Sequence, residues 1–251
     1  MYYCGMGGIL SSISSDGLSF QKEDGVRIQG PAGWASCDPT AVDLPDGKVR
    51  MYYKIAQGQG GPGQAIHKIA SAVSSDGGLN FQDEGVRIDS EKTGDNGWAS
   101  VPEAIVLPDG RVRIYYVSGD PQAMGGIASA VSSDGLNFVK EPGARLPSFV
   151  DPAVVQLPSG VFMIFAVLLP FRPPNDKLKD LKSGIYTFAS IDGLNFTGMM
   201  PVLIAEGGAV YDPGVLKVDD ETLRVYYGKD LGSQTGPNIV TKSITGKISE
   251  G

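Results

Sequence analysis

Short runs of apolar residues recur along the whole chain and predict β-strands throughout. The runs are rich in Val, Ile, Tyr and Phe, and they are bounded by turns whose glycines can adopt positive φ. No segment shows a convincing 3.6-residue period of an amphipathic helix. The pattern therefore predicts an all-β protein.

The predicted strands fall into a unit that repeats every roughly 50 to 60 residues. Within one unit an Asp-Pro element precedes a Leu-Pro-Asp-Gly turn, an Arg-aliphatic-Tyr-Tyr strand and a later Ser-Asp-Gly turn. We expect the phenylalanine after the later turn to pack between neighbouring units. The Asp-Pro element occurs at Asp38-Pro39, Asp151-Pro152 and Asp212-Pro213, with Val101-Pro102-Glu103 as a variant, and the phenylalanines are Phe20, Phe81, Phe138 and Phe196.

Four antiparallel strands repeated at this spacing are typical of β-propeller blades, where each sheet buries its faces only against its neighbours. We count five blades and predict a single five-bladed β-propeller domain over residues 1–251, with four-stranded antiparallel blades. The first unit begins at Met1, already inside a second strand. The first blade is therefore expected to lack its innermost strand. An unpaired strand exposes backbone groups, so a homodimer formed through this incomplete blade is a further possibility.

Composition and net charge limit the classes of partner that this chain is expected to bind. Apolar residues make up 41% and charged residues 20%, which is ordinary for a protein that buries a core, so disorder is not expected. The net charge of -7 argues against nucleic acid or an anionic membrane as partner, because both require a basic face. A neutral ligand fits better. The amino terminus shows no signal or spanning segment, which predicts a cytoplasmic protein, and nothing indicates a cofactor.

Few residues are available for thiol, metal or histidine chemistry. Cys4 and Cys37 are the two cysteines, which excludes a disulfide framework and a thiolate cage around a metal. We expect two buried, unreactive thiols and no metal site. His67 is the single histidine, and a surface role is expected for it.

At these repeats the chain resembles the five-bladed propeller glycoside hydrolases, the group of arabinanases, β-xylosidases, levansucrases and invertases. The resemblance covers nearly the whole chain as a repeat pattern and includes no single diagnostic motif. It implies an acidic residue at the start of the innermost strand of successive blades, so that carboxylates converge at one mouth of a central channel. In this group an Asp base, an Asp that orients and tunes, and a Glu acid follow one another in the first three blades.

The resemblance assigns the second of these roles to Asp38 and the third to Glu103, while the first belongs to the missing strand. Cleavage with inversion needs two carboxyl groups about 6.5 to 9.5 Å apart. Glu103 stands two positions after Val101, and a two-residue step keeps a side chain on the same strand face. Asp151 and Asp212 are candidates for substrate binding. Alternatively, an Asp before Pro caps a turn, because its carboxylate accepts hydrogen bonds from backbone N–H groups.

Three further residues are candidates for substrate binding. Trp34 and Trp98 each lie in a Gly-Trp-Ala-Ser sequence before an inner strand, and sugar rings stack well on indole. Packing against a neighbouring blade is the alternative for both. Arg172, in the long insertion at 168–183, is placed to grip a hydroxyl or a carboxylate, unless this insertion is a solvated, proline-stiffened loop.

The Ser-Asp-Gly turns also fit the Asp-box of sialidase-like propellers, which is a structural turn. A sialidase would need an arginine cluster, whereas the arginines here recur at strand positions expected to face solvent, such as Arg27, Arg87 and Arg145. Two functions stay open. One is a glycoside hydrolase-like protein acting on oligosaccharides through Asp38 and Glu103. The other is a propeller that binds a sugar or a protein without chemistry, which the missing base favours.

Overall fold

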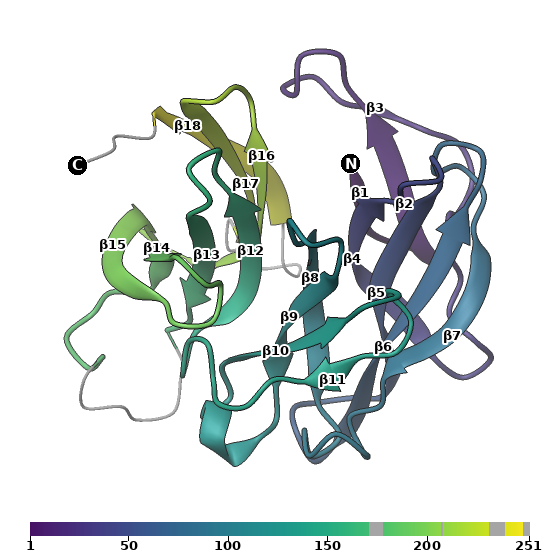
Figure 1. Cartoon of the computed structure of the whole chain (residues 1–251), viewed down its shortest axis with the longest axis horizontal. Helices are drawn as coiled ribbons and strands as arrows, with labels where there is room; N and C mark the ends of the chain where they lie inside the picture. The colour runs from purple at the N-terminus through teal and green to yellow at the C-terminus, as the bar shows by residue number, and fades with distance from the viewer. Residues whose placement is uncertain (171–177, 207, 231–238, 248–251) are drawn as a thin grey trace. The chain divides into compact units, whose positions relative to one another are not determined.

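The computed structural model describes residues 1–251 except 171–177, 207, 231–238 and 248–251 (Figure 1). Eighteen strands form five antiparallel sheets that follow one another along the chain. This is the predicted all-β, five-bladed β-propeller fold. Within the described ranges, helix is confined to a single 3-10 turn, η1 (Pro121–Ala123), and no helix has the length and hydropathy needed to cross a membrane.

The sheets are named blades 1 to 5 in chain order. Blade 1 contains β1 (Tyr2–Gly5), β2 (Gly8–Ile13) and β3 (Gln21–Lys22). Blade 2 contains β4 (Ala35–Asp43), β5 (Val49–Gly58), β6 (Ala65–Ser74) and β7 (Gln82–Ile88). Blade 3 contains β8 (Ala99–Val106), β9 (Val112–Ser118), β10 (Ile127–Ser132) and β11 (Val139–Lys140). Blade 4 contains β12 (Val150–Gln156), β13 (Phe162–Leu168), β14 (Gly184–Ser190) and β15 (Thr197–Ile204). Blade 5 contains β16 (Val210–Lys217), β17 (Thr222–Asp230) and β18 (Ile239–Lys247).

Blade 1 begins with the strand that is second in the other blades. Its β1 carries Tyr2 and Tyr3, the counterparts of Tyr52 and Tyr53 in β5, and its sheet has three strands. The prediction that this blade lacks its innermost strand is confirmed. Blade 5 also has three strands among the described residues, where four were predicted.

The chain divides into two compact units, which are described separately below. The first comprises residues 1–120 and 129–142, and the second comprises residues 121–128 and 143–251. Blades 1 and 2 and most of blade 3 belong to the first unit, and blades 4 and 5 belong to the second.

Each unit has a core where neighbouring sheets meet. In the first unit Met51 and Tyr53 of β5 pack with Ile9 of β2 between blades 1 and 2. In the second unit Phe165 and Ile185 belong to a cluster that includes residues of blade 5. Fully burying a side chain of this size stabilises a fold by about 1.5–3 kcal/mol, so these seams carry much of the stability.

The Ser-Asp-Gly turns are built from the same hydrogen bonds in each repeat. In blade 2, Asp76 Oδ1 accepts the hydroxyl of Ser74 at 2.7 Å and the N–H of Asn80 at 3.0 Å. The Asn80 side chain donates to Asp76 Oδ2 at 2.7 Å. Backbone N–H donors hold the pKa of this carboxyl well below its usual value, and they do the same for its counterparts Asp16, Asp134 and Asp192. These aspartates therefore shape turns.

The same turns join one blade to the next. Arg87 Nη1 donates to the carbonyl of Leu136 at 3.1 Å, and the Tyr52 hydroxyl donates to the carbonyl of Gly135 at 2.8 Å. The Phe138 ring meets the Tyr52 ring edge-on, with centroids 5.6 Å apart. The turn of blade 3 thus contacts blade 2 through both hydrogen bonds and aromatic packing.

Equivalent contacts occur at other seams and decide two sequence predictions. Arg27 binds the Leu79 carbonyl and Arg145 the Leu194 carbonyl, and Arg145 is buried. The prediction that the arginines occupy solvent-facing strand positions is wrong for these two, because both lie in loops and donate to a turn of the next blade. Phe81 packs edge-on against the Tyr2 ring of blade 1. The expected packing between blades is therefore confirmed for Phe81 and for Phe138.

Replacing Arg87 with Ala is expected to lower the free energy of unfolding by about 1–3 kcal/mol, because partly buried carbonyls lose a charged donor. Urea denaturation followed by circular dichroism measures the change. The control is Arg111→Ala, since Arg111 pairs with Asp109 in an exposed turn and should leave the midpoint unchanged. Equal midpoints for Arg87→Ala and the unmodified chain would contradict this role.

Candidate functional site

The inner strands of blades 2 to 5 all contain a β-bulge at the Asp-Pro element or its variant. In β4, Cys37 lies opposite Lys54 while Thr40 lies opposite Tyr52, so β4 carries one extra residue. The same shift of register interrupts β8, β12 and β16. The residue before the proline adopts a left-handed conformation each time, with φ of 51° at Asp38, 47° at Val101, 51° at Asp151 and 46° at Asp212.

Val101 is the unusual member of this set. Asp tolerates the left-handed region comparatively well, whereas a β-branched residue there is a genuine outlier. Strain of this kind persists only where the surrounding structure imposes it. The bulge of β8 therefore keeps the backbone shape of its counterparts although its acidic side chain is absent.

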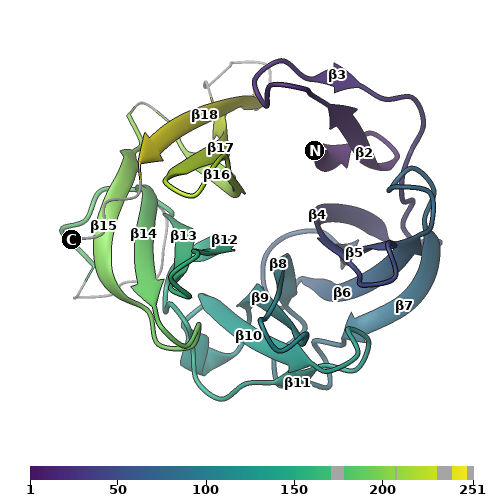
Figure 2. The ribbon, with the colours of Figure 1, turned by 45° about the horizontal axis from the view of Figure 1, so that its top comes forward.

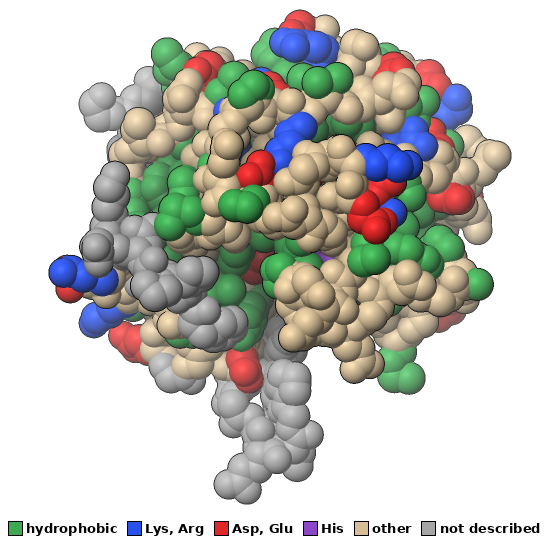
Figure 3. Space-filling view, turned by 90° about the horizontal axis from the view of Figure 1, so that it is seen from below, with side chains coloured by type: hydrophobic (Ala, Val, Ile, Leu, Met, Phe, Trp, Pro, Cys, Tyr) green, Lys and Arg blue, Asp and Glu red, His purple; other side chains and the backbone are tan. Residues whose placement is uncertain are grey.

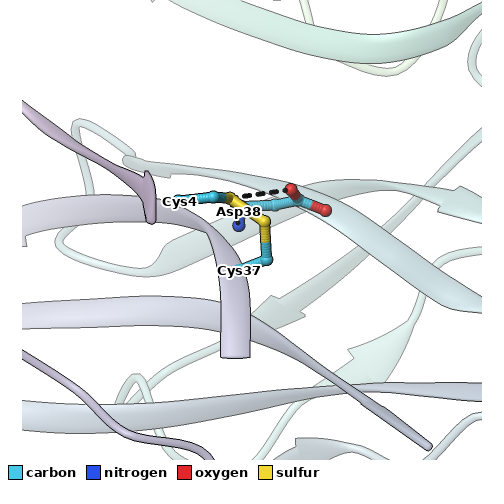
Figure 4. Close-up of side chains that lie close together, drawn as sticks. All are labelled: Cys4, Cys37 and Asp38. Atoms are coloured by element: carbon cyan, nitrogen blue, oxygen red, sulfur yellow. Dashed lines mark hydrogen bonds between the residues drawn. A yellow bond between two sulfur atoms is a disulfide. The ribbon is translucent and has the colours of Figure 1, made fainter. Parts of the chain in front are cut away.

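Asp38 lies at the bulge of β4 and is paired with a lysine. Its Oδ2 is 2.6 Å from Lys54 Nζ on β5, and both side chains are largely buried. Its backbone N–H donates to the Sγ of Cys4 at 3.0 Å, and its Oδ1 lies 3.5 Å from the same sulfur (Figure 4). Asp38 is thus held from both its backbone and its side chain.

Cys4 of β1 and Cys37 of β4 form a disulfide, with Cα atoms 5.0 Å apart (Figure 4). The prediction of two buried, unreactive thiols is wrong, because the two sulfurs are bonded to each other and because Cys4 is exposed and Cys37 only partly buried. The two sulfurs and an Asp38 oxygen lie within 4.8 Å of one another. Thiolates are the metal-binding form of cysteine, so while these sulfurs are bonded to each other they offer no such ligand.

Glu103 lies on β8, immediately after the bulge and opposite Tyr115 of β9. In the first unit β8 runs beside β4 (Figure 2), and the N–H of Ala104 donates to Thr40 Oγ1 at 3.2 Å. The two predicted catalytic carboxyl groups therefore stand on neighbouring inner strands. The two-residue step from Val101 to Glu103 crosses a bulge, so the argument from a regular strand face does not apply to it.

His67 lies within β6 and is 9% exposed, and it accounts for the small purple area in Figure 3. Its ring stacks on Trp98 with centroids 3.7 Å apart, and its Nδ1 shares a hydrogen bond of 3.0 Å with Ser100 Oγ. The expected surface role is wrong because the loop before β8 covers this face of blade 2. Burial, together with the nearby charge of Lys54, lowers the pKa of His67 to about 4.

Both tryptophans contact the protein as well as solvent. Trp34 is partly buried against the core between blades 1 and 2, and Lys68 Nζ lies 5.9 Å from its ring centroid. Trp98 has one face stacked on His67. The packing alternative is therefore realised for part of each ring, and the proposed sugar platforms would use the remaining surface.

A buried charge network near Trp98 was not found from the sequence. Asp95 is completely buried, pairs with Lys140 at 2.7 Å and accepts a hydrogen bond from the Tyr116 hydroxyl. Burial raises the pKa of Tyr116, and the Asp95 charge adds to this effect. The carbonyl of Asp95 accepts the N–H of Trp98, so the network fixes the loop that carries the tryptophan.

In the second unit Asp151 and Asp212 occupy the bulges of β12 and β16. Asp151 is buried, and its Oδ2 accepts the backbone N–H of Asp212 at 3.3 Å. This bond matches the alternative in which an Asp before Pro anchors backbone. Asp212 is exposed, which keeps its carboxylate accessible. Arg172 lies outside the described residues.

No protein-family model matches this chain, and no curated protein matches its sequence. Its structure is similar to a β-1,3-galactosidase of glycoside hydrolase family 43 with galactodeoxynojirimycin, at a TM-score of 0.68 and 15% identity over 98% of this chain and 83% of that one. It is similar to an endo-arabinase from Bacteroides thetaiotaomicron, at a TM-score of 0.62 and 15% identity over 83% of this chain and 74% of that one. It is also similar to fructan 1-exohydrolase IIa from Cichorium intybus, at a TM-score of 0.65 and 18% identity over 89% of this chain and 44% of that one.

A protein of unknown function from Dyadobacter fermentans gives a TM-score of 0.62 at 19% identity over 88% of this chain, which spans 64% of that protein's length. At such identities the similarities establish the fold. The resemblance to five-bladed propeller glycoside hydrolases is confirmed at that level.

The pKa of His67 predicts a pH dependence of stability. An unfolded histidine binds a proton near pH 6.5, whereas the folded one does so only near 4, so stability is present above pH 6.5 and is lost as the pH falls toward 4. Because the ring is buried, the expected loss in the free energy of unfolding is on the order of 1–3 kcal/mol. Urea unfolding between pH 4 and 7 should show it, and His67→Gln should remove this component. An NMR titration of the single histidine near 6.5 would overturn the assignment.

Replacing Val101 with Asn is expected to raise the free energy of unfolding by about 1 kcal/mol, because Asn adopts the left-handed conformation at lower cost than a β-branched residue. Thermal or urea unfolding measures the gain. Val106→Asn is the control, since Val106 is also partly exposed on β8 but lies in regular pairing opposite Val112. A gain of equal size in both variants would mean that the bulge is not the source.

Proposed function

We propose that this chain is a glycoside hydrolase-like protein that cleaves an oligosaccharide, with Asp38 and Glu103 as its central carboxyl groups. The observation that carries the proposal is their placement on neighbouring inner strands, one at a bulge and one directly after the equivalent bulge. The fold shared with family 43 and fructan-degrading enzymes supports the substrate class.

The surroundings of the two residues divide their roles. Asp38 is ion-paired with Lys54, so it acts as a carboxylate that orients the substrate and tunes its partner. Glu103 is the proton donor to the leaving oxygen, since cleavage needs one carboxyl group that carries a proton. The free surfaces of Trp34 and Trp98 stack against sugar rings, and Asp212 offers an exposed acceptor for hydroxyl groups.

A second candidate function is binding of a carbohydrate without cleavage. It is supported by the partly exposed rings of Trp34 and Trp98, which can stack on a sugar whether or not the sugar is cleaved. Without a base the cleavage rate falls steeply, while aromatic platforms and polar acceptors still bind a sugar. Both candidates place the ligand over the same inner strands.

Glu103→Gln is expected to reduce hydrolysis of aryl glycosides and of arabino-, galacto- and fructo-oligosaccharides by about 10²–10⁴-fold, because the general acid is lost. Initial rates of released phenol or reducing sugar measure this. The control is Asp109→Asn, which removes the same charge from an exposed turn between β8 and β9.

Full activity in Glu103→Gln would remove Glu103 from the catalytic site. If the unmodified chain hydrolyses none of these substrates but binds one in calorimetry, the binding function replaces the hydrolase.

A further inference from the structure

At two of the inner-strand bulges the backbone N–H of the left-handed residue donates to a side chain from the preceding blade. In the second unit the N–H of Asp212 is accepted by the carboxylate of Asp151, which stands on the inner strand of the preceding blade. In the first unit the equivalent N–H, that of Asp38, is accepted by the Sγ of Cys4. The acceptor in the first unit is thus a sulfur of β1, where the second unit uses a carboxylate.

The same sulfur is covalently attached to the residue before Asp38. Because Cys37 directly precedes Asp38, the disulfide ties β1 to β4 at the bulge itself. Asp38 is then fixed by the disulfide sulfur at its backbone N–H and by the Lys54 ammonium at its carboxylate. The exposed position of Cys4 leaves this bond open to reagents in solution.

We propose that the Cys4–Cys37 disulfide is a redox-controlled clamp that ties β1 of blade 1 to the bulge of β4 and positions Asp38. The clamp itself is independent of the proposed function. Only its effect on catalysis rests on Asp38 being a site residue.

Opening the clamp requires a dithiol reductant, either a small molecule or a protein with two active-site cysteines. One thiolate of the dithiol attacks the Sγ of Cys4 and displaces the thiolate of Cys37, forming a mixed disulfide. The second thiol then displaces Cys4, so the dithiol is oxidised to a disulfide by two electrons. Its two protons are taken up by the two released cysteines.

Reduction has two consequences for the site. A bridge spanning 33 residues no longer restricts the unfolded chain, which lowers stability. Separated thiols also leave β1 free to move away from the N–H of Asp38, and any thiolate that forms repels the adjacent carboxylate. The Asp38–Lys54 pair then loses its fixed geometry.

The redox conditions of the compartment determine whether the Cys4–Cys37 disulfide is formed or reduced. Disulfides persist in oxidising environments and are rare in the cytosol. The sequence-based prediction of a cytoplasmic location therefore corresponds to the open state, and export would correspond to the closed one.

Thiol titration and thermal unfolding test the clamp. The denatured chain, purified without reductant, should show no free thiol, and two after dithiothreitol treatment. The melting temperature should fall by about 5–15 °C on reduction. The double variant Cys4→Ser/Cys37→Ser should melt at the lower temperature and no longer respond to dithiothreitol. Two free thiols in the air-oxidised protein, or a melting temperature unchanged by reduction, would overturn the proposal.

Amide hydrogen exchange separates positioning of Asp38 from general stabilisation. Reduction should speed exchange of the Asp38 N–H by at least roughly tenfold below the unfolding temperature. Exchange of the Asp212 N–H, which a carboxylate holds in the equivalent bulge, should change far less. Equal acceleration of exchange at both N–H groups would mean that the disulfide stabilises the fold in general and does not specifically position Asp38. Failure of hydrolysis in every assay would leave these results standing and would count against the proposed function alone.

Discussion

A four-stranded sheet has two faces and cannot bury both by itself, so every blade depends on contact with the next one. The Ser-Asp-Gly turn meets this need at several seams. The carboxylate of Asp134 engages the backbone N–H groups of its own turn, and the turn carbonyls at Gly135 and Leu136 then accept donors from blade 2. The repeated turn is thus a docking element between blades as well as a connection between strands.

The same dependence on neighbours shapes the inner strands. Proline has no N–H to give to the ladder, so the Asp-Pro element falls where the pairing is already interrupted by a bulge. The residue before it adopts a left-handed conformation, and at Asp38 and Asp212 its backbone N–H donates to a side chain of the preceding blade. Val101 keeps this conformation without a carboxylate, which indicates that the fold requires the backbone shape and that the acid is an addition to it.

Much of the fold could be predicted because its signals are local. Turn residues, strand composition and the repeat period lie within a few tens of residues, and they identified the five blades and the incomplete first one. The Cys4–Cys37 and Asp95–Lys140 pairs join positions 33 and 45 residues apart in different elements, and no spacing rule encodes them. Arg145 and His67 were misassigned for a related reason, since the local sequence does not reveal which residue distant along the chain covers a side chain.

The candidate site shows how one buried cation can order several groups. Lys54 pairs with Asp38 on β4, and its charge, after the larger effect of burial, helps to keep His67 neutral on β6. A neutral His67 stacks on Trp98 and shares a hydrogen bond with Ser100. A protonated His67 would place an unpaired positive charge at this buried position beside β8. The Lys54 charge therefore acts on both the Asp38 carboxylate and the His67 ring that stacks on Trp98. A ligand bound over both strands would meet one preorganised surface in the first unit, whether it is cleaved there or only held.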